Sequence, residues 1–365
     1  MNKNIVMDAI EILKKYKGRF DPCLEKYFKQ KIKKAKEVDF FASQAIKMIA
    51  DFTLAGGKRI RPALVYYGYL ASGGKEDQKI LEVSMSLEII HSFLLIHDDI
   101  IDRDEKRHGI TTVHEKYKKI GQRIISKSKE DSAHFGNSMA IITGDIAYAM
   151  ANEIIFNSKF SPEIIIQALD KMQNIVYITC AGEMLDVVME NRGRTSEKEI
   201  LHMFEGKTSR YTFEGPLHFG SILSGNSDKK SLDKFSAYSL PLGKAFQIRD
   251  DILGIFGDEK KTGKPVGSDV SEGKQTLLLL KALQKGTREQ KKNLQKYVGK
   301  KDLTKNELEE FRQIIRETGS LKYNQELAEN FVVQSLEALK KIEFKNEEAK
   351  FFMQGLAEYI IKREV

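Results

Sequence analysis

The chain of 365 residues contains no tryptophan, 6 prolines and 2 cysteines. Average proline usage is about 5%, so this chain is poor in the residue that interrupts helices. Long helices are therefore expected, and an all-β architecture is excluded. The two cysteines, Cys23 and Cys180, lie far apart and have no CxxC motif or histidine cluster nearby. This spacing argues against both a disulfide framework and a zinc site.

Long uncharged apolar runs are also absent. No stretch approaches the roughly 18 uncharged apolar residues that a membrane span needs. The N-terminal sequence MNKNIVMDAIEILKKYK mixes charges into its apolar positions, whereas a signal peptide has an uninterrupted apolar core. We therefore expect no membrane span and a cytoplasmic protein. Hydrophobic residues still make up 41% of the sequence, which is enough for a globular core.

The net charge of +8 suits an anionic partner, such as a nucleic acid, an acidic lipid or a phosphorylated metabolite. The sequence shows no basic stripe interleaved with aromatic residues. The basic residues of the motifs described below stand beside acids, which would repel a phosphodiester backbone. We therefore expect no nucleic-acid partner.

Apolar residues recur at helical spacing along most of the chain. Residues 80–101 differ, because their apolar side chains point in every direction around a helix, as in a helix that is buried on all sides. We take this segment as the central helix. Further helices are predicted at residues 138–156, 164–189, 198–223 and 232–256. No strand is predicted. One all-α domain over residues 1–365 is expected, with residues 285–365 as peripheral C-terminal helices.

Two acidic motifs stand at the ends of apolar helices. Asp98, Asp99 and Asp102 belong to DDIID, and Asp250 and Asp251 begin DDILG. Residues four apart share a helix face, so Asp98 and Asp102 can reach one ion together. Crowded carboxylates at a helix C-terminus repel one another and oppose the helix dipole, which favours a compensating cation. Oxygen ligands favour Mg²⁺. The alternative for each motif is a solvated acidic helix end.

Basic residues accompany these acids. GGKRIRP, residues 56–62, places flexible glycines before three cations and a proline suited to the first turn of a helix. This arrangement favours an anion-binding site, with an ordinary loop as the alternative. Further basic residues in motif-like surroundings are Arg107, Lys207, Lys264 and Lys274. Together, acids and bases would bind a diphosphate through a metal on one side and ammonium or guanidinium groups on the other.

The ordered set of motifs resembles the trans-isoprenyl diphosphate synthase (polyprenyl synthetase) family. From about Gly56 to Lys274 the set comprises GGKRIRP, the His91 helix that leads to DDIID, RHG, GKT, FQIRDDILG, TGKPVGSD and EGK. The resemblance implies an all-α isoprenoid synthase fold, a helical bundle around a deep central cavity that is usually dimeric. It also implies that an allylic diphosphate is elongated by isopentenyl diphosphate with Mg²⁺ as the cofactor.

The resemblance further implies roles for individual residues. The metal ligands are Asp98, Asp102 and Asp250, with Asp99 and Asp251 as supporting acids. The cations on the allylic diphosphate are Arg107, Lys207 and Lys264. The isopentenyl diphosphate site contains Lys58, Arg61 and His91, and the wider substrate-binding set adds His108 and Lys274. Thr208 and Gln247 resemble residues that face the reacting carbons. A lone histidine in a buried helix is more often a core residue, so His91 depends mainly on its place in the pattern.

Product length depends on the floor of the apolar channel beside the central helix. Phe93, five positions before Asp98, is the candidate cap, with Leu94 next to it. The alternative is that Phe93 is an ordinary core residue. In the family, an aromatic residue at this place with no insertion in the first acidic motif resembles the geranylgeranyl diphosphate type. A twenty-carbon product is therefore expected, with a farnesyl or longer-chain product as the alternative.

Four positions depart from the family pattern. His108 stands where a second arginine usually follows Arg107, Gly254 replaces a third aspartate, Thr111 replaces a proline and Glu183 replaces a glutamine. None of these changes removes an expected metal ligand. The segment 257–273, rich in glycine, is expected to close over the site and exclude water.

Two other functions compete with this reading. A terpene cyclase also uses DDxxD and Mg²⁺, but it has no need for a second-substrate site such as GGKRIRP with His91. A noncatalytic partner subunit could lose its carboxylates, yet both acidic motifs persist in this sequence. Both alternatives therefore leave ordered motifs unexplained.

Overall fold

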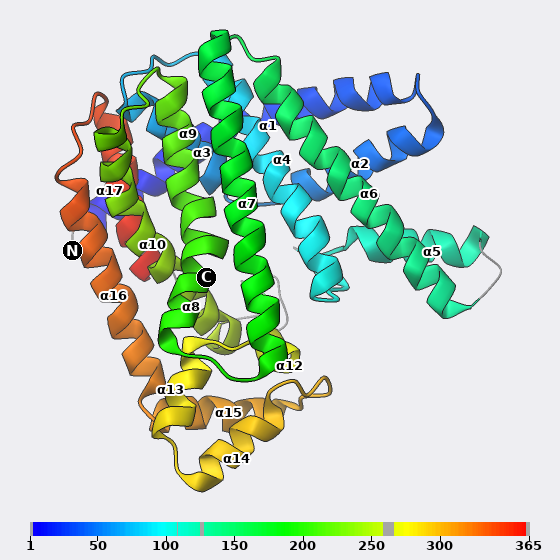
Figure 1. The fold of residues 1–365 in the computed structure, drawn as a ribbon, viewed down its shortest axis with the longest axis vertical. Coiled ribbons are helices and arrows are strands. Elements are labelled where there is room, and N and C mark those ends of the chain that lie inside the picture. Colours follow the sequence, from blue (N-terminus) through cyan, green and yellow to red (C-terminus); the bar gives the residue numbers. More distant parts are fainter. Residues whose placement is uncertain (1–2, 108, 125–127, 258–265, 363–365) are drawn as a thin grey trace.

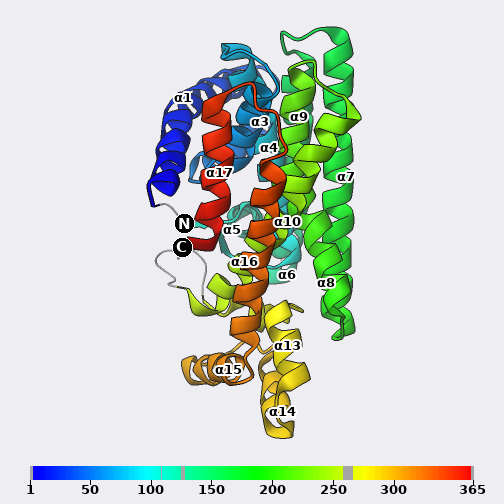
Figure 2. The ribbon, with the colours of Figure 1, turned by 90° about the vertical axis from the view of Figure 1, so that its left-hand side faces the viewer.

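The computed structural model describes residues 3–107, 109–124, 128–257 and 266–362. Figures 1 and 2 show long helices packed side by side, which confirms the predicted all-α class. The first helices are α1 (Lys3–Ala35), α2 (Phe40–Leu54), α3 (Ile60–Ala71), α4 (Gln78–Ile101), α5 (Val113–Ile124), α6 (Lys129–Phe156) and α7 (Pro162–Arg192). They are followed by α8 (Glu197–Phe204), the π-helix η1 (Glu205–Glu214), α9 (Gly215–Leu223), α10 (Lys229–Phe256) and α12 (Ser268–Glu272). The last are α13 (Leu277–Lys285), α14 (Arg288–Tyr297), α15 (Lys305–Glu317), α16 (Ser320–Leu339) and α17 (Glu347–Lys362).

A short hairpin is the exception to this helical fold. Strands β1 (Lys106–Arg107) and β2 (Ile110–Thr111) pair antiparallel directly after α4. The sequence analysis predicted no strand, because two residues are too few to show an alternating pattern. The hairpin matters for the site because it carries Arg107 back toward the end of α4.

The predicted central helix is confirmed as α4. Its side chains are buried around the whole circumference, as at Leu87, Ile89 and Ile90, each 0% exposed. Helix α4 begins after Asp77, whose side chain accepts a hydrogen bond from the backbone N–H of Lys79. Helices α3 and α6 pack against it. The acidic motif therefore ends a helix that is fixed by the core on several sides.

The segment predicted as one helix over residues 198–223 consists of α8, η1 and α9. The π-helical turns of η1 lie between α7 and α10. A Cβ at Gly182 of α7 would lie 2.4 Å from the backbone nitrogen of Lys207, and one at Gly243 of α10 would lie 2.3 Å from the Cα of Ser209. Both glycines are required for this close approach. They allow α7 and α10 to pack directly against the backbone of η1.

The C-terminal region, residues 285–365, divides into two parts. Helices α14 and α15 lie at the lower end of the molecule in Figure 1, below the main bundle. Helix α16 packs along α10, and α17 packs against α1 and α3. Phe352 and Met353 of α17 are 1% and 0% exposed, within the main hydrophobic core. The last helix is therefore part of the bundle that surrounds the site.

Two helices, α4 and α6, are long and apolar enough to cross a membrane when judged by length and composition alone. The sequence analysis did not anticipate this. Most of the apolar stretch of α4 is buried inside the bundle, as in the core helix of a globular fold. The absence of a membrane span stays a prediction.

Candidate active site

A cavity of about 1150 Å³ opens between α4, α7, η1 and α10. Asp98 of α4 and Asp250 of α10 both line it, so the two acidic motifs face one shared space. The other predicted residues that line it are Lys58, Arg61, His91, Phe93, Asp102, Arg107, Lys207, Thr208, Gln247, Asp251 and Lys274. Asp99 is absent from the lining. The predicted residues His108 and Lys264 lie outside the described residues.

The first acidic wall is formed by the end of α4 and the hairpin after it. Asp99 is 0% exposed and accepts a hydrogen bond from Nε of Arg107. The same guanidinium lies 3.3 Å from Asp98 and 3.1 Å from Asp104. Burial raises the pKa of Asp99 to about 7, and the charge of Arg107 limits this rise. Arg107 therefore fixes the end of α4 and also reaches the cavity.

The second acidic wall lies on α10. Gln247 donates a hydrogen bond from its amide to Asp251 over 2.9 Å and accepts one from the hydroxyl of Thr208 over 2.6 Å. Asp251 is 7% exposed, and burial raises the pKa of its carboxyl well above the usual value. The nearby carboxylates of Asp269 and Asp250 raise it further. The structure thus joins the predicted Thr208, Gln247 and Asp251 in one hydrogen-bonded chain.

Lys207 lies across the cavity from the aspartates of α4. Its ammonium is 2.7 Å from Glu183 and 2.7 Å from Asp186, both on α7. Burial opposes the charge on Lys207, but the carboxylates of Asp186, Asp98 and Glu183 outweigh burial and raise its pKa. Lys207 therefore remains an ammonium at neutral pH and can bind an anionic ligand.

Lys274 provides a second cation near the first acidic wall. Its ammonium lies 2.8 Å from Glu272 and 3.4 Å from Asp102. It also lies 3.7 Å from Asp269. Burial opposes the charge of Lys274, and these carboxylates raise its pKa well above the usual value. Lys274 therefore links the segment after α10 to the end of α4.

The GGKRIRP motif contributes two cations to the cavity and one to the core. Arg59 is 4% exposed and donates hydrogen bonds to Asp21 and Glu88 over 2.9 and 2.5 Å, so its role is structural. Lys58 and Arg61, in contrast, line the cavity. Lys58 donates a hydrogen bond over 2.8 Å to the hydroxyl of Tyr359 on α17. The C-terminal helix therefore helps to position this cation.

Arg61 and His91 meet through one tyrosine of η1. The guanidinium of Arg61 lies 4.4 Å from the ring centroid of Tyr211, and it donates a hydrogen bond to Thr212 over 2.9 Å. The hydroxyl of Tyr211 and Nδ1 of His91 share a hydrogen bond of 2.9 Å. Burial raises the pKa of Tyr211, so its hydroxyl stays protonated at neutral pH. Two of the predicted isopentenyl diphosphate residues, Arg61 and His91, therefore lie on the same tyrosine.

Phe93 lies on the apolar side of the cavity and is 8% exposed. Its ring packs edge-on to His97 with the centroids 4.9 Å apart, and it contacts Tyr148 of α6 at 5.2 Å. His97 is bonded through Nε2 to the carbonyl oxygen of Ile141 over 3.1 Å. An aromatic layer thus lies one turn below the acids, where the sequence analysis placed the channel cap.

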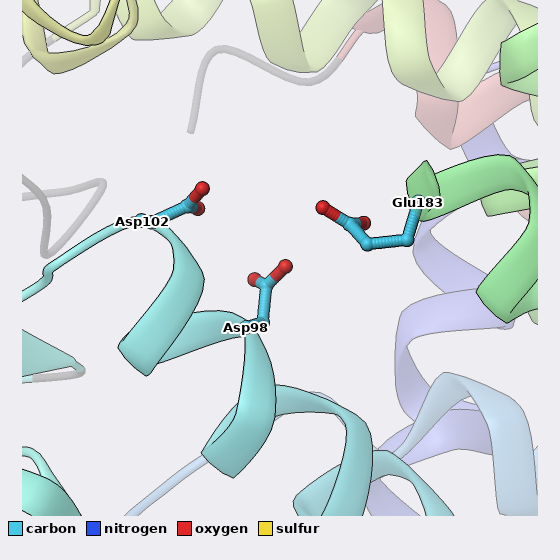
Figure 3. A group of neighbouring side chains, drawn as sticks. All are labelled: Asp98, Asp102 and Glu183. Atoms are coloured by element: carbon cyan, nitrogen blue, oxygen red, sulfur yellow. The ribbon is translucent and has the colours of Figure 1, made fainter. Parts of the chain in front are cut away.

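The carboxylates at the mouth of the cavity fit a divalent cation. Oxygens of Asp98, Asp102 and Glu183 all lie within 4.8 Å of one another, and Figure 3 shows the three groups pointing into a common space. All three of these ligands offer oxygen, which suits Mg²⁺. The burial of neighbouring Asp99 and the mutual repulsion of the acids also favour a cation. The donor set therefore fits the metal that the motifs predict.

The sequence analysis missed several residues that line the cavity or contact its lining. Glu183 was noted as a departure from the family pattern, but no role was given to it. Asp186, Tyr211 and Tyr359 were not named. Glu183 and Asp186 are three residues apart on a predicted helix, so their carboxylates share one helix face. This spacing could have indicated that both face the cavity. Tyr359 gave none, because its contact with Lys58 joins residues 301 positions apart.

The comparisons with known proteins agree with this geometry. A model of the polyprenyl synthetase family matches residues 43–315. Geranylgeranyl diphosphate synthase of Saccharolobus solfataricus is 35% identical over 311 residues, which cover 85% of this chain and 87% of that protein. Geranylfarnesyl diphosphate synthase of Aeropyrum pernix is 31% identical over 314 residues, which cover 85% and 91%.

A solved structure is also similar over nearly the whole chain. It is geranylgeranyl pyrophosphate synthase from Corynebacterium glutamicum, complexed with isoprenyl diphosphate and magnesium. The TM-score is 0.90 with 30% sequence identity, and the match covers 96% of this chain and 99% of that chain. The resemblance drawn from the motifs is confirmed, and this chain belongs to the polyprenyl synthetase family.

Proposed function

We propose that this protein is a chain-elongating prenyltransferase that condenses isopentenyl diphosphate with an allylic diphosphate. The observation that carries the proposal is the single cavity lined by Asp98 and Asp250 from opposite walls, with cations between them and an aromatic layer below. Family membership and the named relatives support it. A charged mouth over an apolar floor suits a substrate that has a diphosphate head and a hydrocarbon tail.

We infer that the metal is Mg²⁺, with Asp98 and Asp102 as ligands on one wall and Asp250 as the ligand of another ion on the other wall. When bound, the metal neutralises negative charge on the departing diphosphate. Arg107, Lys207 and Lys274 add fixed positive charge beside the same group, and this charge is worth most in a site that excludes water. Because these cations are held by ion pairs before substrate arrives, little reorganisation is needed during the reaction.

The second substrate would bind at the opposite corner. Lys58 and Arg61 present cations for the diphosphate of isopentenyl diphosphate, and His91 is linked to Arg61 through Tyr211. Thr208 and Gln247 line the same cavity and are hydrogen-bonded to each other, and we propose that they face the reacting carbons. Holding both substrates in register supplies much of the rate enhancement. Proton loss from the new chain is left to the released diphosphate, as the family resemblance implies, and we assign no protein general base.

For the product we propose geranylgeranyl diphosphate. Phe93 packs against His97 and Tyr148, so the floor below the acids is bulky. The relative from S. solfataricus is named for that product. A longer chain is the alternative, because the relative from A. pernix is named a geranylfarnesyl diphosphate synthase. The preferred allylic primer is set by the same channel.

We also propose that the protein is a homodimer. Apolar side chains are exposed on the adjoining helices α6 and α7, as at Ile142, Tyr177, Met184 and Val188. Met184 and Val188 also line the cavity, so its wall stays open to solvent until another surface covers it. A second copy, with the same face turned toward it, would close that wall. Light scattering should give twice the chain mass, and Ile142→Glu should give the mass of one chain.

Product analysis tests the proposed reaction. The purified protein is incubated with isopentenyl diphosphate, each allylic diphosphate in turn and Mg²⁺, and the products are sized by chromatography. Elongated diphosphates should appear only when both substrates and the metal are present. Products formed without isopentenyl diphosphate would contradict the proposal and favour a cyclase.

A further inference from the structure

Glu183 turns its carboxylate toward the two aspartates that end α4. It belongs to α7, across the cavity, and Figure 3 shows it facing Asp98 and Asp102. One oxygen from each residue lies within 4.8 Å of the others. In one octahedral Mg²⁺ site with bonds of about 2.1 Å, ligand oxygens lie up to about 4.2 Å apart. Small side-chain rotations would therefore bring all three oxygens to one ion.

The described cations around this group are each shared with other carboxylates. The ammonium of Lys207 contacts Glu183, but it is shared with Asp186 at the same distance of 2.7 Å. The guanidinium of Arg107 near Asp98 is shared with Asp99 and Asp104. The ammonium of Lys274 near Asp102 is shared with Asp269 and Glu272. Three carboxylates at this separation repel one another, and each of these cations divides its charge among several acids. A divalent cation is the partner that this charge and this oxygen set favour.

We propose that Glu183 is a third carboxylate ligand of the ion held by Asp98 and Asp102, so that this protein loads one divalent cation before any diphosphate binds. The inference rests on the proposed function, because that function supplies the metal. A glutamine, the residue that the family pattern has here, would offer a neutral oxygen and no charge. Affinity for divalent cations rises with the number of charged ligands. Metal binding would also draw Glu183 away from Lys207 and leave the ammonium paired with Asp186.

Metal binding without substrate tests this inference. Metal-stripped full-length protein is titrated with Mn²⁺, with free Mn²⁺ followed by electron paramagnetic resonance, and with Mg²⁺ by calorimetry. Glu183→Gln keeps the shape of the side chain and removes its charge. We expect one tight site in the unmodified protein and a rise in its Kd of about ten- to a hundredfold in the variant. Circular dichroism checks that the variant is folded.

Glu190→Gln is the matched control. Glu190 lies on the same helix, and its carboxylate is close enough to Asp102 for the two charges to repel each other. It contributes no oxygen to the group formed by Asp98, Asp102 and Glu183. Its substitution should change the Kd less than about threefold, as expected for a screened charge. An unchanged Kd in Glu183→Gln would overturn the inference and leave Glu183 as a partner of Lys207 alone. Equal weakening in both variants would also overturn it, because general charge would then explain the effect.

The two hypotheses fail separately. If the protein forms no elongated product but Glu183→Gln still weakens Mn²⁺ binding, then the proposed reaction is wrong and the metal site stands. If elongation occurs and the Mn²⁺ affinity of folded Glu183→Gln is unchanged, then the reaction stands and the role of Glu183 is wrong.

Discussion

At the end of α4, the buried carboxylate of Asp99 is paired with the guanidinium of Arg107, whereas on α10 the buried Asp251 accepts a hydrogen bond from the neutral amide of Gln247. The α4 wall therefore balances part of its charge with the chain's own cations. Asp251 has no such ion pair among the described residues, so the balance of its own charge depends more on a proton or a bound metal. Two similar aspartate motifs can thus be organised differently before the metal binds.

The largest expected effect is a loss of activity when a metal-binding aspartate is replaced, and the loss should differ between the two walls. Asp98 belongs to the preformed group of three oxygens, and within the described residues Asp250 belongs to no such group. Asp98→Asn should therefore lower kcat/KM on the order of 10³-fold, and Asp250→Asn on the order of 10²-fold. Steady-state kinetics at saturating Mg²⁺ measure both. A larger loss in Asp250→Asn would show that the preformed group is not the main metal site.

Stability gives the next test, because Arg107 is expected to hold the α4 wall together. Arg107→Gln leaves Asp99 buried without its counter-ion, which should cost about 3 to 5 kcal/mol in the free energy of unfolding. Chemical denaturation of the metal-free protein measures this loss. The double variant with Asp99→Asn should regain most of it, because no buried charge is left unpaired. If the double variant is as unstable as Arg107→Gln, then the ion pair is not the cause.

The buried Asp251 of the α10 wall should make the free energy of unfolding depend on pH. Burial raises the folded-state pKa of Asp251 above its unfolded value. Between these two pKa values the folded protein keeps a proton on Asp251 that the unfolded chain has lost. The folded protein is therefore destabilised as the pH rises through this range. The slope for one such group is at most about 1.4 kcal/mol per pH unit. In EDTA, Asp251→Asn should be more stable than the unmodified protein at pH 8, and the difference should shrink toward pH 4. A constant difference would contradict this account.

The smallest effect on rate is expected from substitutions at the channel floor. There we expect the aromatic residue on α4, but not the one on α10, to limit product length. Phe93 lies on α4 below the acids, so Phe93→Ala should shift the main product by at least one five-carbon unit while elongation continues. Phe246→Ala, on α10 and also in the cavity lining, is the matched control and should leave product length unchanged. Chromatography of the products decides the point. An unchanged profile in Phe93→Ala would remove Phe93 as the cap.

Much of the site was readable from the sequence, because its residues lie in short motifs at the ends of helices. Asp98 and Asp102 share a helix face by spacing alone, and the buried pattern of residues 80–101 identified the central helix. These two features depend on local periodicity, which a single sequence carries. The family resemblance of the ordered motifs further implied that Lys207 and Gln247 belong to one cavity, and both line it.

Contacts between distant segments were not readable in this way. Nothing in the sequence distinguishes the three cations of GGKRIRP from one another. Arg59 is a core residue because it bonds to Asp21 and Glu88, which lie far from it in sequence. The π-helical register of η1 was also missed, because its composition resembles that of an ordinary helix. Likewise, the distance between Lys58 and Tyr359 depends on how the last helix returns to the bundle.

The tight packing at Gly182 and Gly243 has a consequence for protein engineering. Any added side-chain atom at either position would push the backbone that carries Lys207, Thr208 and Ser209 out of register. In a saturation mutagenesis screen of this chain, alanine at these two sites should therefore be as poorly tolerated as substitution of a cavity residue. Libraries that aim to alter product size can leave both codons untouched and concentrate their diversity on the aromatic floor.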